Sequence, residues 1–347
     1  MARAAIALLL LCTLGFASGE TIRVLTHTSF VISSDVIAEF EDQTGITVEF
    51  IEGGDAGTTV NRAILTRERP LADLLFGVDN SLIARALDAR IFEPYQSSRL
   101  EHVPGEYIFD EQGFVTPVDV GFVNFNFDLA WFDERDISAP ADITDLTQAP
   151  YRGLTVVPNP VTSSPGLAFM LATIDRFGTE GDYSWLHYWR DLRDNDVQLA
   201  DGWSDAYYTH FNRYGGDRPV VLSYASSPAA EVYFAEEPLQ QSPTANLFCE
   251  KCVYRQIEGV GILQGTENRA AAEEFIDYML SLHFQEDIPL NMWVYPVRQD
   301  AALPEVFAFA ERPQGEHIAQ LPSAEIEANL SDWLSEWTRV VEQGQEP

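Results

Sequence analysis

The chain has 347 residues, of which 54 are acidic and 21 are basic, so its formal net charge is −33. A surface this negative repels nucleic acid and anionic membranes, which argues against either as a partner. It suits a cationic ligand, although a salt-adapted or acid-biased composition gives the same charge without any ligand.

The N-terminal residues 1–19 carry Arg3, then an apolar run over 4–16, then small residues. This is the layout of a secretory signal peptide. The run is too short to span a bilayer comfortably, and no later stretch approaches the roughly 20 apolar residues that a spanning helix needs. The sequence therefore predicts a soluble protein that is exported to the periplasm.

The first part of the mature chain alternates short apolar strands with helices. Strands are predicted at 21–26, 46–52 and 72–78, and helices at 33–45, 58–69 and 81–89. Such alternation predicts a parallel sheet covered by helices on both faces. In sheets of this kind, ligands bind beyond the carboxyl ends of the strands.

The segment 113–132 is aromatic and β-branched, and it is longer than an ordinary strand. It predicts a crossing to a second lobe, where strands at 153–157, 197–200 and 219–224 again alternate with helices. Residues 257–266 resemble a return crossing, after which helices at 267–284 and 323–342 would rejoin the first lobe. The predicted fold class is α/β with two lobes and a ligand cleft between them, divided as 20–122, 123–258 and 259–347.

Small polar, acidic and aromatic residues gather where the predicted strands end. Trp203, Tyr224 and Trp293 offer aromatic faces to a cationic ligand, each contact being worth about 0.5 to 2 kcal/mol. Each could equally be a core residue. The candidates from the other strand ends are His27, Asp55, Asp79, Ser163 and Ser164.

The two serines precede Pro165, which fits the first position of a helix. Their hydroxyls and the free amides behind them would suit a phosphate or a polar ligand tail, or would serve as a plain helix cap.

Cys249 and Cys252 are the cysteines of the mature chain and form the motif CEKC. In an oxidising compartment this predicts a structural disulfide at a hairpin. A redox role would require a helix N-terminus that lowers one thiol pKa, whereas the flanking residues Phe248 and Val253 are typical of strands.

Six motifs occur in a fixed order along the chain: VDNSL, TSSPGL, DGWSDAY, LSYASSP, NMWVYPV and WLSEWTRVV. Together they resemble the thiamine-binding periplasmic proteins of ABC importers, over essentially the whole mature chain. The resemblance implies a type II periplasmic binding protein fold and a monomer without catalytic activity. It also implies thiamine or its phosphate esters as ligand, and a membrane permease and an ATPase as partners.

The resemblance also implies roles for individual residues. Trp203 and Trp293 match ligand-stacking tryptophans, Tyr224 matches a binding tyrosine, and Asp55 matches an aspartate that contacts the ligand. Ser163 falls in the segment that meets the hydroxyethyl or phosphate end.

The sequence departs from the family pattern at three places. His27 stands where a tyrosine is expected, Ala230 stands where an aromatic residue is expected, and a tryptophan near Ser34 is missing. These losses leave fewer aromatic walls for the ligand than the family pattern has.

Three other readings compete with a thiamine binder. A ferric-iron binder of the same fold would use the phenolates of Tyr207 and Tyr208 with His27 and Asp55. A polyamine would suit the same acidic, aromatic site. A hydrolase is disfavoured because the sequence contains no nucleophile elbow, no metalloprotease motif and no phosphate-binding loop.

Overall fold

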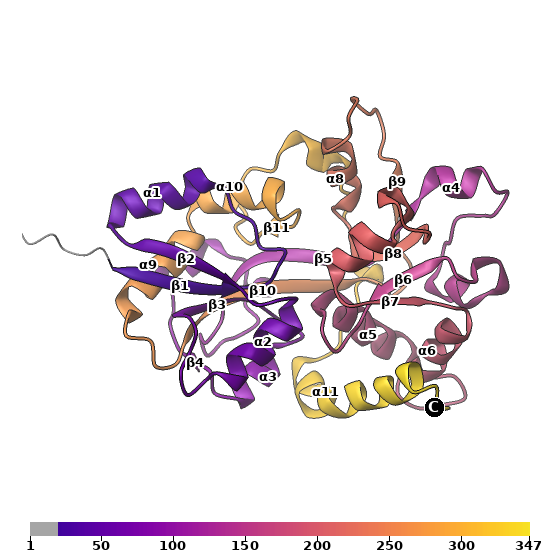
Figure 1. Cartoon of the computed structure of the whole chain (residues 1–347), viewed down its shortest axis with the longest axis horizontal. Coiled ribbons are helices and arrows are strands. Elements are labelled where there is room, and N and C mark those ends of the chain that lie inside the picture. Colours follow the sequence, from indigo (N-terminus) through magenta and orange to yellow (C-terminus); the bar gives the residue numbers. More distant parts are fainter. Residues whose placement is uncertain (1–19) are drawn as a thin grey trace, which may run out of the picture.

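The computed structural model describes residues 20–347, so the predicted signal peptide lies outside the described part. One mixed sheet of 11 strands runs along the long axis of the molecule, with helices on both of its faces (Figure 1). The strand order is β2-β1-β3-β10-β5-β8-β6-β7. Within residues 20–347, no helix is both long and apolar enough to cross a membrane.

The first lobe follows the predicted alternation. Its elements are β1 (Thr21–Thr26), α1 (Ser34–Thr44), β2 (Thr47–Glu52), α2 (Ala56–Leu65), β3 (Leu74–Asp79), α3 (Ile83–Asp88) and β4 (Phe92–Glu93). β1 lies between β2 and β3 and is parallel to both. Every residue of β3 is buried, as expected for a parallel strand covered on both faces.

Two long antiparallel strands form the centre of the sheet, at the predicted crossings. β5 (Thr116–Asp128) and β10 (Tyr254–Leu263) pair with each other, β10 continues the sheet to β3, and β5 continues it to β8. All 13 residues of β5 are buried. The lobe limits expected at 122 and 258 fall inside these two strands and stay a prediction.

The second lobe repeats the parallel pattern. Its elements are α4 (Leu129–Asp133), β6 (Thr155–Pro158), α5 (Ser164–Phe177), α6 (Trp185–Asp194), β7 (Gln198–Ala200), α7 (Trp203–Asp205), β8 (Val220–Tyr224), α8 (Ser227–Tyr233) and β9 (Thr244–Leu247). β6 is parallel to β7 and to β8. A π-helical turn, Ala206–His210, follows α7 directly.

The C-terminal part contains α9 (Arg269–Met279), α10 (Leu282–Asn291), β11 (Tyr295–Pro296) and α11 (Ser323–Trp337). The single helix predicted at 267–284 is wrong, since a break at Leu280 and Ser281 separates α9 from α10. α11 contacts α3 of the first lobe and α6 of the second (Figure 1). Leu330, Trp333 and Trp337, spaced three and four residues apart on α11, are buried and form its core face.

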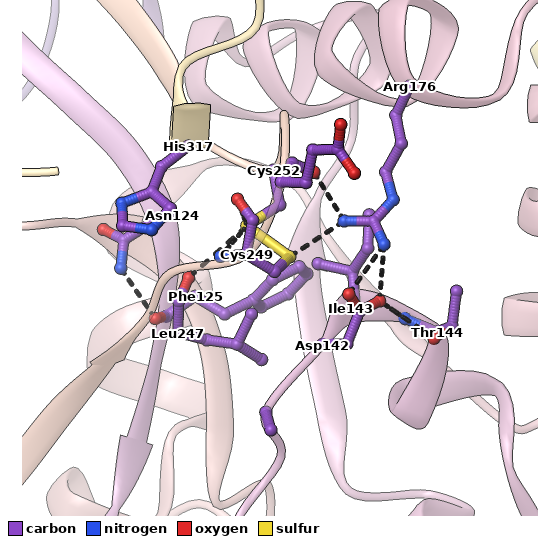
Figure 2. Close-up of a disulfide and its surroundings, with 12 residues drawn as sticks. Asn124, Phe125, Asp142, Ile143, Thr144, Arg176, Leu247, Cys249, Cys252 and His317 are labelled. Carbon is purple, nitrogen blue, oxygen red and sulfur yellow. Dashed lines mark hydrogen bonds and ion pairs between the residues drawn. A yellow bond between two sulfur atoms is a disulfide. The ribbon is translucent and has the colours of Figure 1, made fainter. Parts of the chain in front are cut away.

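Cys249 and Cys252 form a disulfide, with their Cα atoms 5.4 Å apart (Figure 2). The predicted hairpin around them is wrong, because β9 and β10 do not pair with each other. Both pair with one edge of β5, where Phe125 faces Leu247 and Val123 faces Tyr254. Residues 248–253 therefore leave the sheet as a loop, and the disulfide closes that loop.

The disulfide is buried, and the side chain of Arg176 lies beside it. The guanidinium of Arg176 donates to Cys249 Sγ at 3.0 Å and to both carboxylate oxygens of Asp142 at 2.8 and 2.6 Å (Figure 2). These bonds connect the loop to α5 and to the segment between α4 and β6, which favours a stabilising role for the bridge.

Candidate ligand-binding site

One cavity lies where strands of both lobes end. Its volume is ≈ 760 Å³ when the space open to solvent is included. It is lined by His27, Ser29, Asp55, Ala56, Ser164, Pro165, Trp203, Tyr207, Tyr208, Tyr214, Tyr224, Ser227, Ala230, Phe234, Glu258, Met292, Trp293 and Val294. None of these lining residues is a lysine or an arginine, so the charged groups in the wall favour a cation.

Trp203 begins α7 and forms the centre of the aromatic wall. Its indole N–H donates to Ser223 Oγ at 2.8 Å, which fixes the plane of the ring. Tyr207, one helical turn later, stacks on it with ring centroids 5.2 Å apart and an interplanar angle of 24°. Tyr224, at the end of β8, meets the same indole edge to face at 6.3 Å. The ring is thus held in place while part of it faces the cavity.

Asp55 connects the two lobes at the site. It is the N-cap of α2, and its carboxylate accepts the backbone N–H of Ala56 at 2.7 Å and that of Trp203 at 3.0 Å. A side chain at position 202 would collide with this carboxylate, which explains why Gly202 precedes the tryptophan. Burial raises the pKa of Asp55 above its ordinary value, while these N–H donors oppose the rise.

Tyr224 leads from the aromatic wall to a buried polar network. Its hydroxyl donates to Gln256 Oε1 at 3.0 Å. Gln256 Nε2 donates in turn to Asp79 Oδ2 at 2.7 Å and to Ser164 Oγ at 2.8 Å. A side chain at Gly121 would collide with the Tyr224 ring, so the glycine in the middle of β5 makes room for Tyr224.

Trp293 has a left-handed backbone, with φ 57°, which is rare for a bulky residue. The surroundings hold it there: Ser226 Oγ donates to its carbonyl oxygen, and its ring lies parallel to that of Phe307 at 5.9 Å. Backbone strain of this kind costs about 1 to 3 kcal/mol and clusters at ligand sites. It aims the indole at the cavity from the loop between α10 and β11.

His27 and Glu258 form the polar side of the cavity. The backbone N–H of Ser29 donates to His27 Nδ1 at 3.2 Å, which leaves the proton of the neutral ring on Nε2. That atom lies 3.5 Å from Glu258 Oε2. Burial acts to lower the pKa of His27, but Glu258, with Asp55 and Asp79, outweighs burial and raises it overall.

The predicted site residues divide into two groups. His27, Asp55, Ser164, Trp203, Tyr224 and Trp293 line the cavity together. Ser163 and Asp79 do not line it. Ser163 is the buried N-cap residue of α5, and Asp79 reaches the cavity only through Gln256. A role for all eight in ligand binding stays a prediction.

Several lining residues were not predicted. Tyr207 and Tyr208 were considered only as iron ligands, although both phenol rings lie in the aromatic wall. Phe234 lies one helical turn after Ala230, so its i,i+4 spacing could have revealed it. Glu258 lies in the predicted crossing strand, which is mostly apolar. A single carboxylate in such a strand was the sequence feature that could have indicated a functional residue there.

Comparison with known proteins agrees with this arrangement. The family model "Bacterial extracellular solute-binding protein" matches residues 69–310, more than half of the chain. The chain belongs to the bacterial extracellular solute-binding protein family. Its fold is that of type II periplasmic binding proteins, so the predicted two-lobed α/β fold class is confirmed.

Individual relatives cover nearly the whole chain. It is 27% identical over 339 residues to the "Thiamine-binding periplasmic protein" of Salmonella typhimurium, covering 96% of this chain and 97% of the relative. It is also 27% identical over 346 residues to the protein of that name from Escherichia coli, covering 98% and 99%. The solved structure "Periplasmic thiamin binding protein" superposes with a TM-score of 0.80 at 25% identity, covering 92% of this chain and 96% of that one.

Proposed function

We propose that this protein captures thiamine, or one of its phosphate esters, outside the cytoplasm and delivers it to the permease and ATPase of an ABC importer. The observation that carries the proposal is the cavity itself, which is lined by the aromatic rings of Trp203, Tyr224 and Trp293 together with the carboxylates of Asp55 and Glu258. Thiamine is a cation with two flat rings, and such a ligand gains from both kinds of wall. The names of the relatives support the same ligand.

Binding would couple to closure of the two lobes. Asp55 of the first lobe already accepts the N–H of Trp203 in the second, and the hydroxyls of Ser29 and Ser204 lie 3.4 Å apart across the same boundary. A ligand that contacts both lobes binds the closed form better than the open one and shifts the population towards it. The closed form is then the species that the permease recognises.

The phosphate end of a thiamine ester would meet the start of α5. Ser164 lines the cavity there and belongs to the first turn of a 14-residue helix. Helix N-termini favour anions, so this helix end would suit the phosphate. Capture of a ligand for import requires export of the protein to the periplasm, and the predicted signal peptide over 1–19 would direct that export.

The iron alternative is less well supported by the geometry. The phenols of Tyr207 and Tyr214 both donate to Glu231 Oε1, at 2.7 and 3.1 Å, which commits them to a carboxylate inside the second lobe. Within residues 20–347, no group of three or more His, Cys, Asp or Glu side chains could hold a metal ion. Thiamine and its esters therefore fit the cavity better.

Isothermal titration of the mature protein tests the proposal directly. Thiamine, thiamine monophosphate and thiamine diphosphate are titrated in turn, with ferric citrate and spermidine as competing ligands. One-to-one binding of a thiamine form without a response to iron is the expected result. A response to iron or spermidine with silence for every thiamine form would contradict the proposal and assign the cavity to another cation.

A further inference from the structure

Three buried carboxylates lie side by side across the centre of the sheet, at the polar side of the cavity. On β10, Glu258 pairs with Asp79 of β3 on one side and with Asp119 of β5 on the other. Glu258 lines the cavity, whereas Asp79 and Asp119 flank it and are fully buried. Directly paired residues point to the same face of a sheet, and like charges in such pairs repel. We call these three residues the carboxylate row.

The members of the carboxylate row differ sharply in their hydrogen bonds. Asp79 Oδ1 accepts from the backbone N–H and hydroxyl of Ser81 and from the N–H of Leu82, and Oδ2 accepts from Gln256. Neither carboxyl oxygen of Asp119 has a hydrogen-bond partner among the described residues. A buried carboxylate without a partner is costly, and protonation is the usual relief. Of the three residues, Asp119 is therefore the one whose surroundings most favour the protonated form.

The surroundings of Asp119 supply no cation to replace that proton. The titratable groups that face it are Glu258 on β10, Asp79 on β3 and the Tyr224 phenol on β8. β11 contributes Pro296, which has no titratable group. Burial and the two carboxylates raise the pKa of Asp119 well above its ordinary value, and burial raises that of Asp79 to about 6.

The charge of the whole group depends on what occupies the cavity. Among residues 20–347, His27 is the basic group paired with the row, through Glu258, and it also lines the cavity. A ligand cation beside Glu258 would offset the negative charge of the row, as the protons on Asp119 and His27 do in the ligand-free protein. Both groups would then lose protons more easily, because a nearby positive charge favours their less protonated forms.

We propose that the carboxylate row is the cation subsite of the cavity, and that a cationic ligand entering it expels one proton, held mainly by Asp119, into solution. The proposal rests on the proposed function for the identity of the cation and adds a pH dependence to it. Since the free protein binds more protons than the complex, affinity rises with pH, by up to about tenfold per pH unit for one full proton. The ligand is bound best at neutral pH and released more readily in acid.

Two measurements test this proposal. In the first, thiamine is titrated calorimetrically at pH 7 in phosphate and in Tris, whose ionisation enthalpies differ, and the difference in heat gives the number of protons released. In the second, the infrared spectrum of the ligand-free protein at pH 7 is searched for the C=O stretch of a buried protonated carboxyl. The second measurement needs no thiamine, so it tests the row even if the cargo is another cation.

Asp119→Asn is the informative variant and Asp128→Asn is its matched control. Asp128 lies on the same strand, is similarly buried and caps α4, where asparagine caps equally well. The expected result is a carboxyl band and proton release in the wild type and in Asp128→Asn, both reduced in Asp119→Asn. A ligand-free wild type without the band, or thiamine binding with equal heat in the two buffers, would overturn the inference. A band without any thiamine binding would instead contradict the proposed cargo.

Discussion

The two sides of the cavity differ in kind. The second lobe contributes aromatic rings, from Trp203, Tyr207 and Tyr224. The first lobe and β10 contribute His27, Asp55 and Glu258, which carry charge. Stacking depends on area and shape and changes little with pH, whereas the charged side depends on protonation. The aromatic residues should therefore determine most of the affinity and the charged residues its pH dependence, so the two properties can be altered separately.

The largest effect on affinity is expected from the aromatic wall. Trp203→Ala removes the central ring and should weaken thiamine binding by about 10- to 100-fold, since a buried aromatic contact with a cation combines stacking and apolar area. Trp203→Phe, which keeps a smaller ring, is the control and should lose less. Titration calorimetry measures both. Unchanged affinity in Trp203→Ala would remove the aromatic wall from the binding site.

The charged residues of the cavity wall and the carboxylate row should make the free energy of unfolding of the ligand-free protein depend on pH. The folded-state pKa values of Asp79, Asp119 and His27 are raised, so the native state binds more protons than the unfolded state. The free energy of unfolding should therefore fall as the pH rises from 5 to 7.5, by about 1 to 3 kcal/mol. Urea denaturation at several pH values checks this.

Asp119→Asn should flatten that pH dependence, because it removes one of the raised groups. Stability that rises over the same interval would mean that the row is ionised in the native state, contrary to the geometry of its buried oxygens.

Asp55→Asn tests the point where the two walls meet. Asparagine keeps one oxygen that can cap α2 at Ala56, so the fold should persist, whereas the negative charge and the second acceptor, which takes the Trp203 N–H, are lost. Thiamine affinity should fall about tenfold, the usual scale for a hydrogen bond to a charged group. Asp128→Asn, the same change at another helix cap, should bind as the wild type does. Equal affinity in the two variants would argue against a ligand contact by Asp55.

A smaller effect is expected at the mouth of the cavity. Phe234 is 64% exposed, lines the cavity one turn after Ala230, and meets Trp293 edge to face at 5.4 Å. Phe234→Ala should weaken binding about threefold, and adding Ala230→Tyr should restore it by returning a ring to the same helix face.

Tyr233→Ala is the control for this position, because Tyr233 also packs on Trp293 but does not line the cavity. An equal loss in that variant would show that both residues only support the tryptophan.

The disulfide should have the least influence on the ligand. It closes a short loop away from the cavity, so replacing Cys249 and Cys252 by serine should lower the free energy of unfolding by about 2 kcal/mol. Calorimetric affinity for thiamine should not change. A large loss of affinity would connect the loop to the site through β5, the strand that also carries Asp119.

The sequence by itself determined the alternating elements of both lobes, because parallel strands covered on two faces read as short apolar runs between helices. It also placed six of the eight candidate site residues at the cavity, since the carboxyl ends of such strands meet at one edge. Trp203, Tyr224 and Asp55 followed from that rule.

Only the tertiary structure decided which of these polar groups share a site and what charge they carry. Asp119 and Glu258 lie 139 positions apart in the chain yet pair across β5 and β10. In the sequence both stand inside apolar crossing strands, where nothing marks them as neighbours. Strand register brings them together, and burial without hydrogen-bond partners favours the protonated form of Asp119.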